Sequence, residues 1–314
     1  MNDIRNNVIV SIIGSGLMGH GIALDFALSG FKVYLNDVSK EKIDLGIIQI
    51  SETIDYLSRS RNLDKKKILR NIFPEESLQL ALHDSNIVLE AVYEDLDLKK
   101  DIFKYVEKNV SSDCILLSNT STFMPSEITG NFLHPERFAI SHYYNPPYLL
   151  PGIEIVSGEK TSKSIIDFLM KFYKSINKKP SLVKKEIKGF VGNRLQAALL
   201  RESLKLVEEG YVSHEDLDQI VKGSFGRRLS AAGPFELREI IGLDLGLSIT
   251  KQIIPTLGNS QEISKLISSK ILDGDLGVKS GKGFYEWNDK KKRNWKKHML
   301  DWLILLEQED KNSQ

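Results

Sequence analysis

The feature that most constrains the fold is a glycine-rich turn between an apolar segment and a helical one. The run Val8–Ile13 is short and rich in β-branched residues, and it leads directly into Gly14-Ser15-Gly16-Leu17-Met18-Gly19. Small and apolar residues then recur at helical spacing until Gly30. An uninterrupted apolar run of this length is typical of a strand buried on both faces. The sequence therefore predicts a strand, a tight turn and a helix.

The segment Phe31–Leu35 reads as a second strand, so the start of the chain is a strand–helix–strand unit with parallel strands. In this context the three glycines of a G-x-G-x-x-G motif permit the tight turn, the close approach of a diphosphate and close helix–strand packing. Phosphates bind to free N–H groups at the helix N-terminus. We expect five residues of this segment to contact NAD: Gly14, Gly16, Leu17, Met18 and Gly19. A purely structural glycine turn is the alternative.

Asp37 ends the second strand, 23 residues after Gly14. A carboxylate at this place accepts a hydrogen bond from a ribose 2′-hydroxyl and repels a 2′-phosphate, which favours NAD over NADP. Lys40 lies close in sequence and acts in the opposite direction. The alternative role of Asp37 is that of a turn or helix-cap residue.

Strands and helices continue to alternate over the first half of the chain. Further strands are expected at 87–92, 115–118, 138–141, 152–156 and 180–183. This alternation predicts an α/β domain of the doubly wound Rossmann type. After residues 184–189 the pattern becomes almost entirely helical. We expect a dinucleotide-binding domain over 1–187, with a helical hairpin inserted near 40–72, and an all-helical domain over 188–314.

Composition narrows the classes of partner. The 314 residues include 43 basic and 42 acidic side chains, giving a net charge of +1. Such a balance argues against a nucleic-acid or membrane-surface binder, and no apolar run approaches the length of a spanning helix. The single cysteine, Cys114, suits a reducing compartment. We expect a soluble, cytoplasmic protein that acts on a small molecule, and no metal-ligand cluster.

His142 directly follows the strand predicted at 138–141. In open α/β sheets, the carboxyl ends of the strands face the ligand. An imidazole can take the proton of an alcohol while hydride leaves the same carbon. A structural histidine is the alternative.

Several separated motifs together resemble the 3-hydroxyacyl-CoA dehydrogenase family over nearly the whole chain. They are the glycine loop with Met18, Leu89–Glu94, Ser118–Ser121, His142–Asn145, Gly189–Arg194, Gly233-Pro234 with Gly242–Asp244, and Lys279–Tyr285. The resemblance implies a catalytic set of Ser121, His142, Glu154 and Asn193. It also implies cofactor contacts from Glu94, Lys99, Ser121, Asn145 and Lys279, and a homodimer.

The family divides by substrate into enzymes of 3-hydroxyacyl-CoA thioesters and enzymes of small free 3-hydroxy acids, such as lambda-crystallin, L-gulonate 3-dehydrogenase and carnitine dehydrogenase. The segments 145–151 and 193–196 are similar to the free-acid branch, whereas 233–237 and 241–244 resemble short-chain hydroxybutyryl-CoA enzymes. The resemblance slightly favours a (3S)-3-hydroxyacyl-CoA such as 3-hydroxybutyryl-CoA. A free 3-hydroxy acid is the alternative, and a non-catalytic NAD-binding protein is a second one.

Basic residues give each branch a candidate substrate contact. A basic cluster between two expected helices is placed to bind CoA phosphates, as the matching segment does in the CoA branch: Arg59, Arg61, Lys65, Lys66 and Lys67. For a free acid, the candidate carboxylate clamps are Arg227 and Arg228. A solvated helix-pair tip is the alternative for the cluster.

Overall fold

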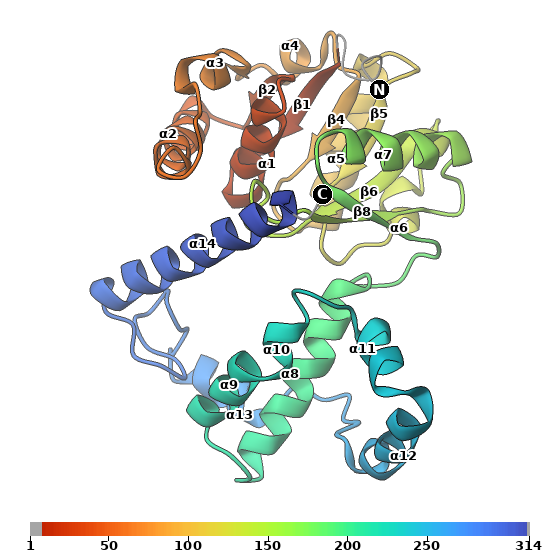
Figure 1. Ribbon diagram of the computed structural model, residues 1–314. Coiled ribbons are helices and arrows are strands. Elements are labelled where there is room, and N and C mark those ends of the chain that lie inside the picture. The colour runs from red at the N-terminus through yellow and green to blue at the C-terminus, as the bar shows by residue number, and fades with distance from the viewer. Residues whose placement is uncertain (1–7, 313–314) are drawn as a thin grey trace. The chain divides into compact units, whose positions relative to one another are not determined.

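The computed structural model describes residues 8–312 (Figure 1). The chain divides into two compact units. The first holds the chain as far as Asn193 together with the segment from Leu300 onward, and the second holds Arg194–Met299. The sequence predicts a single boundary at residue 187; the chain passes between the two compact units twice, after Asn193 and before Leu300.

The first unit is built on one eight-stranded sheet in the order β3-β2-β1-β4-β5-β6-β7-β8. All neighbouring strands are parallel except β6 and β7. The strands are β1 (Ile9–Ile13), β2 (Lys32–Asn36), β3 (Ile72–Pro74), β4 (Ile87–Glu90), β5 (Ile115–Ser118), β6 (Phe138–Tyr143), β7 (Gly152–Val156) and β8 (Lys179–Val183). The expected strands are present, and β3 was not predicted because three residues carry too little pattern.

Helices cover both faces of this sheet because its central strands are apolar on both sides. On β4, Leu89 packs into a core with α1, α2 and α7, whereas the adjacent Val88 packs into a second core with α4, α5 and α6. The helices are α1 (Leu17–Leu28), α2 (Lys40–Leu57), α3 (Lys65–Arg70), α4 (Leu78–Leu82), α5 (Leu96–Asn109), α6 (Pro125–Thr129) and α7 (Lys163–Ser175), with a 3₁₀ turn, η1, at Pro135–Arg137. This arrangement confirms the doubly wound α/β fold.

The second unit is helical, as the sequence predicted. One expected cap is present: the Ser213 side chain accepts a hydrogen bond from the backbone N–H of Asp216. The helices that begin in or before this unit are α8 (Gly192–Glu208), α9 (His214–Gly223), α10 (Phe225–Arg228), α11 (Pro234–Ile241), α12 (Leu243–Ile253), α13 (Lys265–Leu272) and α14 (Asp289–Asn312), with a 3₁₀ turn, η2, at Ile254–Thr256.

The last turns of α14 belong to the first unit and pack on it. Leu300 and Ile304 are buried against Leu57 of α2 and Leu149 of the loop after β6. Polar contacts flank this small core: Tyr56 donates to Asp301, Lys179 donates to Asp310, and Arg61 forms an ion pair with Glu307. Among residues 8–312, no helix combines the length and the apolar character needed to cross a bilayer.

Candidate active site

The glycine loop adopts a conformation that only glycine allows at two of its three positions. Gly14 has a φ of +100°, and a Cβ there would lie 2.6 Å from the carbonyl oxygen of Ala91. A Cβ on Gly19 would lie 1.7 Å from the carbonyl oxygen of Gly14. A Cβ on Gly16 would meet nothing within 4 Å, so this position is the open one. Gly14 and Gly19 therefore shape the loop, and Gly16 leaves room beside it.

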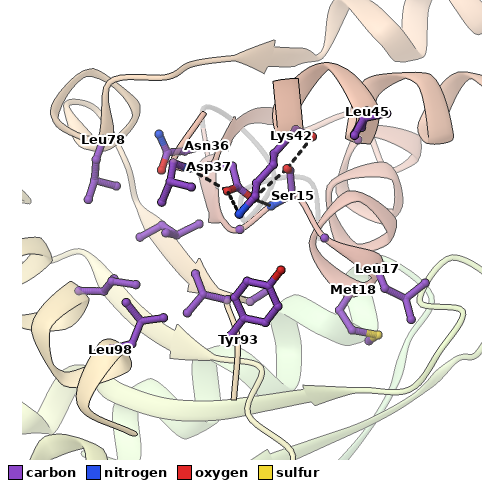
Figure 2. A pocket seen from close by; sticks show the side chains of 18 of the residues that line it. Ser15, Leu17, Met18, Asn36, Asp37, Lys42, Leu45, Leu78, Tyr93 and Leu98 are labelled. Atoms are coloured by element: carbon purple, nitrogen blue, oxygen red, sulfur yellow. Dashed lines mark hydrogen bonds and ion pairs between the residues drawn. The ribbon is translucent and has the colours of Figure 1, made fainter. Parts of the chain in front are cut away.

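A cavity of about 720 Å³ lies beside the loop, lined by Gly14–Met18, by Asn36-Asp37 at the end of β2 and by Ala91–Tyr93 after β4 (Figure 2). Gly16 is the N-cap of α1, and no side chain makes a capping hydrogen bond there. The N–H groups of a helix N-terminus attract phosphate. The open face of Gly16 and the uncapped helix thus fit the diphosphate of a dinucleotide. Gly19 packs inside the loop and does not line the cavity.

Asp37 lies where the ribose was expected, and it also holds the glycine loop. Its Oδ2 accepts hydrogen bonds from the backbone N–H of Ser15, at 2.7 Å, and from the Ser15 hydroxyl, at 2.9 Å. Lys40, which the sequence placed near Asp37, pairs instead with Asp44 at 2.7 Å. The cation beside Asp37 is Lys42, whose Nζ lies 3.7 Å from Oδ1.

His142 and Glu154 occupy paired positions on the antiparallel strands β6 and β7. Nδ1 of His142 lies 2.8 Å from Oε2 of Glu154. That oxygen also accepts a hydrogen bond from the Tyr144 hydroxyl, and Oε1 accepts from the backbone N–H groups of Val191 and Gly192. Both carboxylate oxygens are therefore satisfied in a site that is almost closed to solvent.

These partners set the charge of Glu154. Burial acts to raise the pKa of its carboxyl group, but the hydrogen bonds from His142, the Gly192 backbone, Tyr144 and the Val191 backbone outweigh it and lower that pKa to about 2. Glu154 is thus a carboxylate at neutral pH. A carboxylate only accepts hydrogen bonds, so Nδ1 of His142 carries the proton and Nε2 is left for exchange.

The segment after β8 reaches the dyad through an unusual backbone. Gly189 and Phe190 have φ values of +73° and +51°. The ring of Phe190 is fully buried, with its centroid 5.4 Å from that of His142. A Cβ on Gly192 would lie 1.8 Å from the Tyr144 hydroxyl oxygen. A side chain at position 192 would therefore displace the Tyr144 ring, whose hydroxyl donates to Glu154.

Glu94 and Lys99, both expected at the cofactor, have different surroundings. Oε1 of Glu94 accepts hydrogen bonds from the backbone N–H groups of Ser121 and Thr122 and from the hydroxyls of Thr120 and Thr122. Burial acts to raise the Glu94 pKa, but the hydrogen bonds from Thr120 and Thr122 and the charge of Lys99 lower it overall. Glu94 thus orders the loop that carries Ser121.

Lys99 is only 1% exposed, and its Nζ lies 2.7 Å from Oε1 of Glu90 and 3.3 Å from Oε2 of Glu94. Glu90 also accepts from the Ser118 hydroxyl at 2.6 Å. Burial raises the pKa of Glu90 despite the opposing charge of Lys99. Lys99 therefore bridges two carboxylates inside the protein.

Ser121 and Asn193 also meet: the Asn193 side-chain amide donates to the carbonyl oxygen of Ser121 at 3.1 Å. All four expected catalytic residues lie in the first unit, which extends as far as Asn193. Two hydrogen-bonded pairs, His142–Glu154 and Asn193–Ser121, are connected through the backbone at 191–193.

The remaining predicted residues lie elsewhere. Asn145 is exposed in the loop after β6, and Lys279 and Arg227 are exposed in the second unit. In the basic cluster, Arg59 is exposed with its guanidinium 5.0 Å from the Tyr56 ring centroid. Arg61 and Lys65 are already paired, with Glu307 and with Asp55.

Sequence reasoning gave no role to Glu90, Tyr144 or Phe190. All three stand within the motifs that carry the family resemblance, and Tyr144 follows His142 by two residues. A glutamate in an otherwise apolar strand, as at Glu90, is a signal that a partner is needed, because burying a lone carboxylate is costly.

A mostly parallel sheet, a glycine loop with an open helix N-terminus and a buried histidine–carboxylate pair define an NAD-binding dehydrogenase of the Rossmann type. The chain belongs to the 3-hydroxyacyl-CoA dehydrogenase family. The family model of the NAD binding domain matches residues 9–187, and that of the C-terminal domain matches residues 189–287.

Three known proteins illustrate the similarity. The chain is 32% identical to 5-formyl-3-hydroxy-2-methylpyridine 4-carboxylate 5-dehydrogenase of Mesorhizobium japonicum, over 90% of each chain. A crystal structure of a dehydrogenase with this substrate name, an NAD⁺-dependent dismutase, superposes with a TM-score of 0.89 at 28% identity, covering 95% of this chain and 96% of that one. The crystal structure of the (S)-3-hydroxybutyryl-CoA dehydrogenase of Ralstonia eutropha superposes with a TM-score of 0.74 at 28% identity, covering 90% of this chain and 99% of that one.

Proposed function

We propose that the protein interconverts a small 3-hydroxy carboxylic acid and its 3-oxo form, with His142 as the general acid and base. The observation that carries this proposal is the 2.8 Å contact between Nδ1 of His142 and Oε2 of Glu154, since it fixes the imidazole tautomer. Proton exchange with the substrate then takes place at Nε2, which accepts a proton in oxidation and returns it in reduction.

The step balances as a two-electron oxidation. When bound, NAD⁺ would accept the hydride that leaves the carbinol carbon. Nε2 of His142 takes the hydroxyl proton, the carbon–oxygen bond becomes a carbonyl, and the imidazolium that forms is stabilised by the Glu154 carboxylate. The hydroxyl of Ser121 and the amide of Asn193 are proposed to donate hydrogen bonds to the substrate oxygen, where negative charge develops in reduction.

We propose that Glu94 and Lys99 act on the cofactor indirectly. The four hydrogen bonds that Glu94 accepts hold the 120–122 loop, and Lys99 holds Glu94. Asn145 and Lys279 remain candidate cofactor contacts, and Arg227 remains the candidate clamp for a substrate carboxylate.

Two observations favour a free acid over a CoA thioester. In the basic cluster, Arg61 and Lys65 already have carboxylate partners. The partner of Arg61 is Glu307, which stands in the last turns of α14, beyond both family models. Negative charge beside the cluster disfavours a polyphosphate. The relative with the TM-score of 0.89 carries a carboxylate substrate in its name.

A short-chain 3-hydroxyacyl-CoA such as 3-hydroxybutyryl-CoA is the second candidate. Arg59, Lys66 and Lys67 remain exposed near the α2–α3 turn and are free of the ion pairs described above. The name of the Ralstonia eutropha enzyme supports this candidate.

The test is oxidation of NADH with acetoacetyl-CoA, acetoacetate and aromatic 3-oxo or formyl carboxylates in parallel. We expect kcat/KM for at least one free acid to exceed that for acetoacetyl-CoA by tenfold or more. The reverse order would establish the thioester. In either case His142→Asn should lower kcat about 10³-fold while NADH still binds. NADH binding without turnover of any of these compounds would favour a non-catalytic NAD-binding protein.

The homodimer is proposed for the second unit. Its helices α11 and α12 expose large apolar side chains, among them Phe235, Ile240 and Leu243, with exposed fractions of 86%, 78% and 66%. Apolar surface of this extent typically marks an interface. Light scattering coupled to gel filtration should give twice the chain mass of 35.6 kDa. The division into an NAD-binding and a helical domain at residue 187, and the cytoplasmic location, stay predictions.

A further inference from the structure

Lys42 is a cation at the wall of the dinucleotide cavity that no motif of the sequence singled out. Among the described residues that line this cavity, Lys42 carries the only positive charge, whereas Asp37 and Glu76 are acidic. Lys42 stands in the first turn of α2. Figure 2 shows its side chain extending toward Asp37 and Ser15, with Tyr93 on the other side of the cavity.

The backbone of Lys42 is fixed, but its ammonium group is not fully engaged. The carbonyl oxygen of Lys42 accepts a 2.9 Å hydrogen bond from the Ser15 hydroxyl. Its Nζ lies 3.7 Å from Oδ1 of Asp37, longer than a hydrogen bond, and 5.5 Å from the Tyr93 ring centroid. The side chain is 45% exposed. An ammonium at this distance is free to donate to a ligand.

Asp37, in contrast, has given most of its acceptor capacity to the protein. Its Oδ2 accepts two hydrogen bonds from Ser15, and Oδ1 accepts one from the backbone N–H of Val38. The charge that would repel a 2′-phosphate is thereby partly neutralised, both by these donors and by Lys42. A cation beside the carboxylate that binds the ribose is also the type of group that pairs with a 2′-phosphate.

We propose that Lys42 is a cofactor-specificity residue that narrows the preference for NADH over NADPH, because its ammonium pairs with the 2′-phosphate that Asp37 alone would repel. NADH remains the better ligand through Asp37. Lys42 makes binding of NADPH measurable.

The experiment measures direct binding of NADH and NADPH by nicotinamide fluorescence, without substrate, so it stands apart from the identity of the substrate. Lys42→Gln removes the charge at nearly constant length. We expect its Kd for NADPH to rise about tenfold, about 1.4 kcal/mol, and its Kd for NADH to change less than about threefold. Lys40→Gln is the matched control, since Lys40 stands two residues earlier and does not line the cavity. It should leave both Kd values unchanged.

A second comparison tests the charge of Lys42 in a background that lacks the charge of Asp37. Asp37→Asn should tighten NADPH binding, and Lys42→Gln in that background should abolish the gain. Raising ionic strength should weaken NADPH binding more than NADH binding in the wild type, and equally in Lys42→Gln. An unchanged ratio of the two Kd values in Lys42→Gln overturns the proposal. A larger loss of affinity for NADH than for NADPH also overturns it, because the lysine would then bind the diphosphate that both dinucleotides contain. An absence of NADPH binding to the wild type overturns it as well.

Discussion

His142 and Glu154 are direct register partners across β6 and β7, and their side chains meet at 2.8 Å. Glu154→Gln keeps the shape but places an N–H donor opposite Nδ1, which moves the imidazole proton to Nε2. We expect kcat for oxidation to fall about 10²- to 10³-fold, while the Kd of NADH stays within a factor of about two. Steady-state kinetics and NADH titration measure the two. Retention of kcat within threefold would contradict the base role of His142.

The charge of Glu154 also predicts how stability depends on pH. Its pKa is about 2 in the folded protein, below the usual 4.5. The lowered pKa stabilises the fold fully above about pH 4.5, and this contribution, about 3 kcal/mol, is lost as the pH falls toward 2. Compared with Glu154→Gln, the wild type should therefore lose about 2 kcal/mol of unfolding free energy between pH 7 and pH 3. Urea denaturation at both pH values measures it, and a pH-independent difference would refute the assignment.

The glycine loop offers a contrast between two alanine variants. A Cβ at position 16 meets nothing, whereas a Cβ at position 19 meets the carbonyl oxygen of Gly14. Gly16→Ala should fold with wild-type stability and lose NADH affinity at least tenfold, because the methyl group occupies the space of the diphosphate. Gly19→Ala should lose both stability and affinity. Equal thermal stability of the two variants would show that the loop relaxes around the added methyl group.

Lys99 is predicted to matter more for folding than for direct cofactor contact. Lys99→Met leaves Glu90 buried without its cation, which should cost about 3–5 kcal/mol of unfolding free energy. The double variant with Glu90→Gln removes the unpaired charge and should recover part of that loss. Denaturant unfolding of the wild type, of Lys99→Met, of Glu90→Gln and of the double variant gives the coupling free energy. A double variant less stable than Lys99→Met would argue against a paired role.

The end of α14 is predicted to stabilise the first unit. Leu300→Ala and Ile304→Ala should each lower the unfolding free energy by about 2–4 kcal/mol, because both side chains are buried. Leu305→Ala is the matched control: Leu305 is 53% exposed on the same helix and should change stability by less than about 0.5 kcal/mol. Equal effects at 300 and 305 would mean that this contact contributes little.

The fold was largely predictable from local pattern. Buried β-branched strands, the glycine turn and the alternation of strand and helix were sufficient for the doubly wound class, because each of them acts within about ten residues. The return of α14 was not predictable. Its sequence indicates a helix, but nothing in it specifies that Leu300 and Ile304 cover Leu57 and Leu149, which stand far away in the chain.

The site was predictable in its residue types and less so in its contacts. The resemblance named His142 and Glu154, and their pairing follows from an antiparallel register that the sequence alone does not fix. Lys99 and Lys100 are adjacent on one polar helix, and only the position of Glu90 on the neighbouring strand determines that Lys99 is the buried one. In the same way, only the folded structure determines that Lys42 lies beside Asp37, whereas Lys40 pairs with Asp44.

The discontinuous first unit has a consequence for synthesis. About 150 residues separate Leu149 from the helix end that covers it. At about 5–20 residues per second, a ribosome takes roughly 8–30 seconds to make that stretch. During this time Leu57 and Leu149 lack the two side chains that cover them in the folded unit, so this contact forms only after both compact units have been synthesised. A chain truncated before Leu300 would therefore keep all eight strands of the sheet but expose this small apolar patch.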